Sequence, residues 1–192
     1  MKKLIVIDSC MRAESRTKLI LDAAVAELSK RYEVEIIDVN SVGLPPLDKV
    51  TYVDQRENGN IPPLAVEIAR KVAACDRLVV AAPFWDMSFP AILKSFFENI
   101  SLFDITFTDD GTTCRGLCKC EKVLYITTRG MDIKTGDPLE QGFPYLTALS
   151  FLWGLGEVIT VAATNMDYLS PEELALRIEA AKKEAVKVSF EF

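Results

Sequence analysis

Residues 3–28 read KLIVIDSCMRAESRTKLILDAAVAEL, and the pattern of this stretch changes twice. Residues 3–7 are a continuous aliphatic run, which is typical of a parallel strand covered on both faces. Residues 9–14 are polar, and from Ser15 apolar residues recur at helical spacing toward an expected helix end near Tyr32. The stretch therefore predicts a strand, a loop and a helix.

The same alternation continues to the end of the chain. Further strands are predicted at 34–39, 77–82, 122–127 and 158–163, and further helices at 63–74, at 90–102, before Gly154 and after Ser170. Five strands alternating with five helices predict an α/β fold, a doubly wound parallel sheet with helices on both faces.

Two connections are longer than this fold requires. Residues 40–62 contain prolines and glycines with little periodicity and predict a long surface loop. Residues 104–119 predict a hairpin or an ordered flap. Neither is expected to divide the chain, so residues 1–192 are predicted to form a single domain.

Composition narrows the classes of function. The 192 residues are 49% hydrophobic and have a formal net charge of −6, which disfavours nucleic acid and anionic lipid as partners. The N-terminus has too few apolar residues for a secretion signal, so a cytoplasmic protein is expected. The most apolar stretch, 145–163, is interrupted by glycines and predicts a buried helix and strand instead of a membrane span.

The chain has no histidine, which excludes Ser-His-Asp and Cys-His nucleophile pairs and HExxH zinc hydrolysis. Its five cysteines are expected to be free thiols in a reducing compartment. Cys114, Cys118 and Cys120 have no fourth ligand for a structural zinc site, so no metal is expected.

Ligands of parallel sheets bind beyond the carboxyl ends of the strands, which selects the loops 9–17, 83–89 and 128–137. The first loop brings Ser15, Arg16 and Thr17 to a helix start, where free amides favour an anion such as phosphate. The alternative is that Ser15 only caps the helix.

Aromatic residues distinguish the second loop. Phe84 and Trp85 are unfavourable in water unless they cover a flat ligand or a partner, whereas Asp86 is either functional or simply solvated. In the third loop Gly130 permits close backbone approach to a ligand, and Arg129 at a strand end is more commonly just solvated.

Three segments together resemble the family of FMN-dependent NADH-azoreductases and NAD(P)H quinone reductases, which has a flavodoxin-like fold. They are AAPFWDMSFPAILKSFFENI (81–100), GLCKCEKVLYITTRG (116–130) and PYLTALSFLWGLG (144–156). The resemblance implies FMN as cofactor and, as its binding residues, Ser9, Ser15, Arg16 and Thr17 for the phosphate and Pro83, Phe84, Trp85, Asp86, Met87, Thr128, Arg129 and Gly130 for the ring.

The resemblance also implies hydride transfer from NADH or NADPH through FMN to a quinone or azo compound by a ping-pong mechanism, without a catalytic acid or base. It further implies a homodimer with both sites at the interface. The chain departs from the family at Asp86, usually asparagine, at Met131, usually glycine, and by lacking the histidine that often follows. An acidic Asp86 would disfavour a reduced anionic flavin.

Two other functions fit the same alternation. A flavodoxin-like FMN electron carrier resembles T-x-T-G-x-T in its phosphate loop, and this chain lacks that pattern. A phosphoryl-receiver module needs clustered carboxylates after the first strand, where Asp8 stands alone. Fold class does not separate these functions from a reductase.

Overall fold

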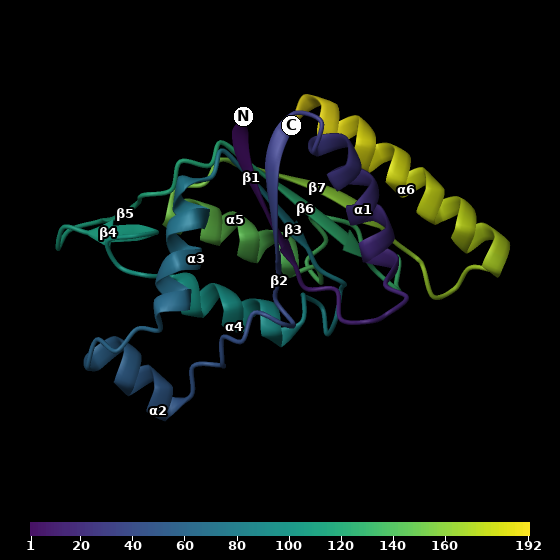
Figure 1. Ribbon diagram of the computed structural model, residues 1–192. Coiled ribbons are helices and arrows are strands. Elements are labelled where there is room, and N and C mark those ends of the chain that lie inside the picture. The colour runs from purple at the N-terminus through teal and green to yellow at the C-terminus, as the bar shows by residue number, and fades with distance from the viewer.

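A five-stranded parallel sheet organises the computed structural model, which describes residues 1–192 (Figure 1). Its strand order is β2-β1-β3-β6-β7, and every neighbouring pair is parallel. The strands are β1 (Lys2–Asp8), β2 (Tyr32–Asp38), β3 (Arg77–Ala81), β6 (Lys122–Thr128) and β7 (Glu157–Ala163). The predicted flavodoxin-like sheet is confirmed, and its winding reverses between β1 and β3.

Helices cover both faces of this sheet, as predicted (Figure 1). One face packs against α1 (Arg16–Leu28) and α6 (Pro171–Glu191), and the other against α3 (Pro63–Ala74), α4 (Ala91–Ile100) and α5 (Gly142–Trp153). Alternate residues of β1 therefore enter different cores. Leu4 and Val6 belong to the α1/α6 core, and Ile5 and Ile7 to the opposite one, which explains the uninterrupted apolar run.

One expected boundary is wrong, and one predicted loop contains helical turns. The first helix ends at Leu28, and Tyr32 already begins β2 by pairing with Lys2 of β1. The segment 40–62 is not structureless, because it contains the short helix α2 (Lys49–Tyr52) and a π-helical turn, η1 (Val53–Glu57). The Asp48 side chain accepts a hydrogen bond from the Thr51 amide at 2.8 Å and so starts α2.

The hairpin predicted within 104–119 is present, formed by the antiparallel strands β4 (Phe107–Asp109) and β5 (Cys114–Gly116). Its base contacts the end of α5 so closely that a Cβ on Gly116 would lie 2.0 Å from the Gly154 amide nitrogen. The Cys118 amide also donates to the Trp153 carbonyl at 2.9 Å. A side chain at position 116 would therefore push the hairpin off α5.

The apolar stretch 145–163 forms most of α5 followed by β7, and Gly154 ends the helix in a left-handed conformation with φ 72°. No helix in the structure has both the length and the apolar character needed to cross a membrane. All five cysteines are free, and Cys120 lies in the core beside Cys75.

Candidate functional site

The loops after β1, β3 and β6 meet at one edge of the sheet around a pocket of about 160 Å³. Nine of the twelve predicted site residues line it: Ser15, Arg16, Thr17, Pro83, Phe84, Trp85, Thr128, Arg129 and Gly130. Ser9, Asp86 and Met87 do not line it, and sequence reasoning missed Met11, Arg12, Glu14, Met166 and Asp167, which do.

Thr128 joins these loops to one another. Its hydroxyl forms a hydrogen bond of 2.7 Å with the hydroxyl of Thr17, which is fully buried. Its carbonyl accepts a hydrogen bond of 3.1 Å from the amide of Phe84. The start of α1 and the aromatic loop after β3 are therefore both fixed to the end of β6.

The N-terminus of α1 opens into the pocket. Ser15 caps the helix by accepting a hydrogen bond from the Lys18 amide at 3.3 Å. The expected capping role of Ser15 is therefore confirmed, and it leaves other amides of the first turn unpaired. The cap satisfies one amide of the first turn, while the amides of Arg16 and Thr17 lie at the positive end of a 13-residue helix. Such an end favours an anionic group.

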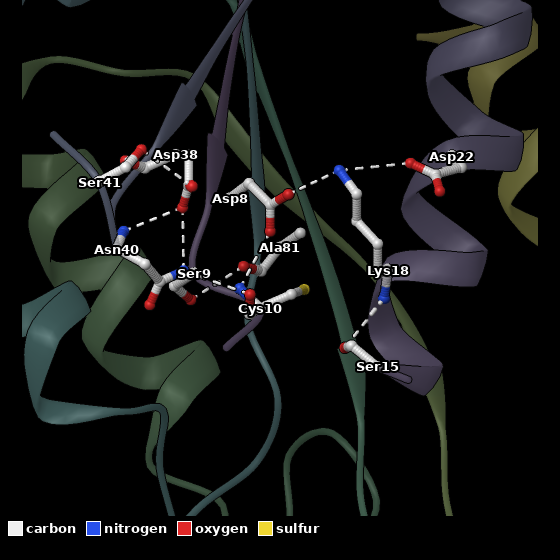
Figure 2. Close-up of polar contacts among 10 residues, drawn as sticks. All are labelled: Asp8, Ser9, Cys10, Ser15, Lys18, Asp22, Asp38, Asn40, Ser41 and Ala81. Atoms are coloured by element: carbon white, nitrogen blue, oxygen red, sulfur yellow. Dashed lines mark hydrogen bonds and ion pairs between the residues drawn. The ribbon is translucent and has the colours of Figure 1, made fainter. Parts of the chain in front are cut away.

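Ser9 attaches the start of this loop to β3 (Figure 2). It is fully buried, and both its amide and its hydroxyl donate to the Ala81 carbonyl of β3 at 2.9 Å. The neighbouring Asp8 carboxylate accepts bonds from the Cys10 amide at 2.9 Å and from Lys18 Nζ at 2.7 Å. Asp8 and Ser9 thus shape the loop without facing the pocket.

The side-chain ammonium group of Lys18 is ion-paired with two carboxylates. Its Nζ lies 2.7 Å from Asp8 and 3.3 Å from Asp22, as Figure 2 shows. Desolvation alone would lower the pKa of Lys18, but its hydrogen bond to Asp8 and the two negative charges raise the pKa overall. The positive charge available to an anion in the pocket therefore comes from arginines.

Arg16 has a partner within the pocket. Its Nη1 lies 2.7 Å from Asp167 Oδ1 and 3.2 Å from the Met166 carbonyl. Asp167 in turn lies so close to Gly130 that a Cβ there would come within 2.0 Å of Asp167 Oδ2. The loop after β7 was outside the three selected loops, although it follows a strand of the same sheet and could have been included on that ground.

A tight turn gives the aromatic loop its shape. Trp85 and Ser88 exchange two backbone hydrogen bonds of 2.9 Å, and between them Asp86 and Met87 have φ values of 48° and 67°. This left-handed region is tolerated by aspartate and asparagine but is unfavourable for methionine by roughly 1–2 kcal/mol. The Met87 carbonyl also accepts a bond from the Gln141 amide at 2.8 Å, which ties the turn to the segment before α5.

Arg129 is fully buried, contrary to the expectation of a solvated arginine. Its Nη1 donates to the Ile133 carbonyl and its Nη2 to Thr135 Oγ1, both at 3.0 Å, while its guanidinium lies 5.5 Å from the centroid of the Phe84 ring. The Nε has no hydrogen-bond partner. Burial lowers the pKa of Arg129, which the charge of Glu140 opposes, and an arginine remains protonated at neutral pH.

This combination of a parallel sheet, a helix start and an aromatic loop at the switch point defines the class of open α/β proteins that bind ligands beyond the carboxyl ends of their strands. The sequence profile of the flavodoxin-like fold matches residues 1–188. An FMN-dependent NADH:quinone oxidoreductase from Lachnoclostridium phytofermentans is 30% identical over 201 residues, with all of both chains covered. A second one, from Clostridium acetobutylicum, is 31% identical over 200 residues, covering 96% of this chain and 98% of the relative.

The chain therefore belongs to the flavodoxin-like family that includes the FMN-dependent NADH:quinone oxidoreductases. Solved structures agree on the fold. An azoreductase from Bacillus anthracis aligns over the whole of both chains with a TM-score of 0.83 at 18% identity. An FMN-dependent NADH-azoreductase from the same species, in complex with FMN, has a TM-score of 0.80 at 19% identity, covering 98% of this chain and all of that one.

The residues present fit an FMN group. The start of α1, with Arg12 and Arg16 nearby, suits a phosphate, and Phe84 with the half-exposed Trp85 suits an aromatic ring system. The Nε–H of buried Arg129 has no hydrogen-bond acceptor within the protein, so it is free to donate to a bound ligand. The pocket thus offers groups for both ends of such a ligand.

The bond between Thr17 and Thr128 can be tested by a double-mutant cycle. Replacing either threonine by valine leaves the other hydroxyl buried and unpaired, so each single variant is expected to lower the free energy of unfolding by about 1–3 kcal/mol. The double variant should cost less than the sum of the two by about 1 kcal/mol, measured by urea unfolding. Strictly additive losses would contradict the role of this bond.

Proposed function

We propose that this protein is an FMN-dependent oxidoreductase that transfers hydride from NADH or NADPH to a quinone or azo compound by a ping-pong mechanism. FMN, when bound, supplies the hydride chemistry, and the protein binds, orients and covers it. The observation that carries the proposal is the joining of an anion-binding helix start to an aromatic loop through Thr128. It is supported by full-length similarity to proteins named FMN-dependent NADH:quinone oxidoreductases.

In this proposal the phosphate lies against the amides of Arg16 and Thr17 and the side chains of Ser15 and Arg16. The ring system lies against two sets of residues. They are the aromatic loop, Pro83, Phe84, Trp85, Asp86 and Met87, and the end of β6, Thr128, Arg129 and Gly130. Ser9 fixes the start of the phosphate loop and does not contact the phosphate itself, because its hydroxyl and amide both donate to the Ala81 carbonyl.

The proposal includes no catalytic acid or base. The chain has no histidine, and the thiol beside the phosphate loop is that of Cys10. Burial, reinforced by the nearby Asp8, raises the pKa of Cys10 to about 12, so this thiol stays protonated at neutral pH. The chain's part in the reaction is therefore to place the donor and the acceptor in turn against the same ring.

We further propose a cytoplasmic homodimer in which a second copy completes each site. A pocket of about 160 Å³ is smaller than the roughly 300–1,000 Å³ of a pocket that encloses a drug-sized ligand. Large apolar side chains are exposed on α5 and near the aromatic loop, with Phe151 at 85%, Leu139 at 56% and Trp85 at 41%. Sedimentation equilibrium at micromolar concentration should give a dimer, and a monomer would reject the shared site.

The activity is tested by titration and turnover. The apoprotein should retain FMN and its yellow colour after gel filtration, and under anaerobic conditions NADH should be consumed beyond one equivalent per bound FMN only when a simple quinone such as 1,4-benzoquinone is present. Double-reciprocal plots at several quinone concentrations should be parallel, as a ping-pong mechanism requires. FMN binding without NADH consumption would indicate an electron carrier, and no FMN binding would reject the proposal.

The phosphate position is tested by Arg16→Glu. This change places a third negatively charged group beside Asp167 and the phosphate, so FMN should bind roughly tenfold more weakly, about 1.4 kcal/mol, while riboflavin, which lacks the phosphate, should bind almost as before. Arg115→Glu in the hairpin, which does not line the pocket, is the matched control and should change neither affinity. Equal weakening of FMN and riboflavin by Arg16→Glu would place the phosphate elsewhere.

A further inference from the structure

Arg129 and Glu140 form an ion pair beneath the pocket. The Nη2 of Arg129 lies 3.6 Å from Oε1 of Glu140, and both side chains are completely buried. A buried charge is costly unless it is paired, so each residue is the main counter-charge of the other. Glu140 itself does not line the pocket.

Glu140 is held firmly by main-chain groups. Its Oε1 accepts hydrogen bonds from the amides of Gly142 at 2.9 Å and Phe143 at 3.0 Å, the first residues of α5. Amide donors at a helix start form strong hydrogen bonds with a carboxylate. The negative charge of Glu140 is therefore fixed in place at the beginning of α5.

Glu140 also lies between the two segments that the proposed function places around the ring. On one side is Arg129, which lines the pocket and still has an unpartnered Nε. On the other side the amide of Gln141 donates to the Met87 carbonyl of the aromatic turn at 2.8 Å. A change in the charge of Glu140 therefore changes the electrostatic potential at the pocket, because its ion-pair partner Arg129 lines the pocket.

We propose that Glu140 is a positioning residue that offsets the charge of Arg129 at the pocket and thereby limits how strongly the site prefers reduced over oxidised FMN. This inference rests on the proposed function. Hydride transfer from NADH gives NAD⁺ and a reduced flavin that carries one additional negative charge. An unopposed guanidinium would favour that charge, and the carboxylate of Glu140 weakens the effect.

The test is Glu140→Gln, whose side-chain oxygen can still accept from Gly142 and Phe143 but carries no charge. The affinity for oxidised FMN comes from a fluorescence titration, and that for reduced FMN follows from the midpoint potential of the bound flavin. The preference for reduced over oxidised FMN should rise about tenfold or more. In Glu140→Asp, which keeps the charge, and in Glu157→Gln, an exposed control on β7, it should change less than about threefold.

A folded Glu140→Gln variant that binds FMN with the wild-type preference would overturn the inference. If this variant does not fold, the double variant Arg129→Gln/Glu140→Gln, which leaves no unpaired buried charge, provides the test. Because the two charges offset each other, it should keep the wild-type preference to within about threefold, and a fall of about tenfold or more would overturn the inference. A wild type that binds no FMN rejects the proposed function itself, which separates the two failures.

Discussion

The two hydrogen bonds of Thr128 are the constraint on which the site depends. Parallel pairing of β1, β3 and β6 brings three loop starts to one edge of the sheet, but it does not fix where those loops go. The bonds to Thr17 and Phe84 do so, because each joins a different element to the same residue at the end of β6. The N-terminus of α1 and the aromatic loop are therefore both attached to the end of β6.

The arginines around the pocket differ in how firmly they are held. The pair between Arg16 and Asp167 has side chains that are 32% and 63% exposed, and such a pair contributes about 0–1 kcal/mol. Arg16 can therefore exchange Asp167 for another anion at little cost. Arg129 donates hydrogen bonds to a main-chain carbonyl and a hydroxyl inside the protein, is ion-paired with a buried carboxylate, and has no such freedom. One arginine is adaptable, and the other is part of the scaffold.

The sheet and its order of helices were predictable because strands buried on both faces have continuous apolar runs, as β3 has in Leu78–Ala81 and β1 in Leu4–Ile7. The three loops followed from a rule about parallel sheets, and nine of the twelve residues named in them line the pocket. The burial of Arg129 was not predictable, because its counter-charge Glu140 lies in an irregular segment that has no periodicity. The inward position of Ser9 likewise depends on a bond to another strand.

The left-handed turn after Trp85 limits how this site can be altered. β-branched residues at positions 86 and 87 would add steric strain to a conformation that already disfavours most L-amino acids, whereas asparagine, aspartate and glycine are tolerated. Combinatorial libraries that vary the pocket lining would therefore best randomise Trp85, which lines the pocket. They would restrict position 86 to those three residues, so that most clones keep a correctly formed loop.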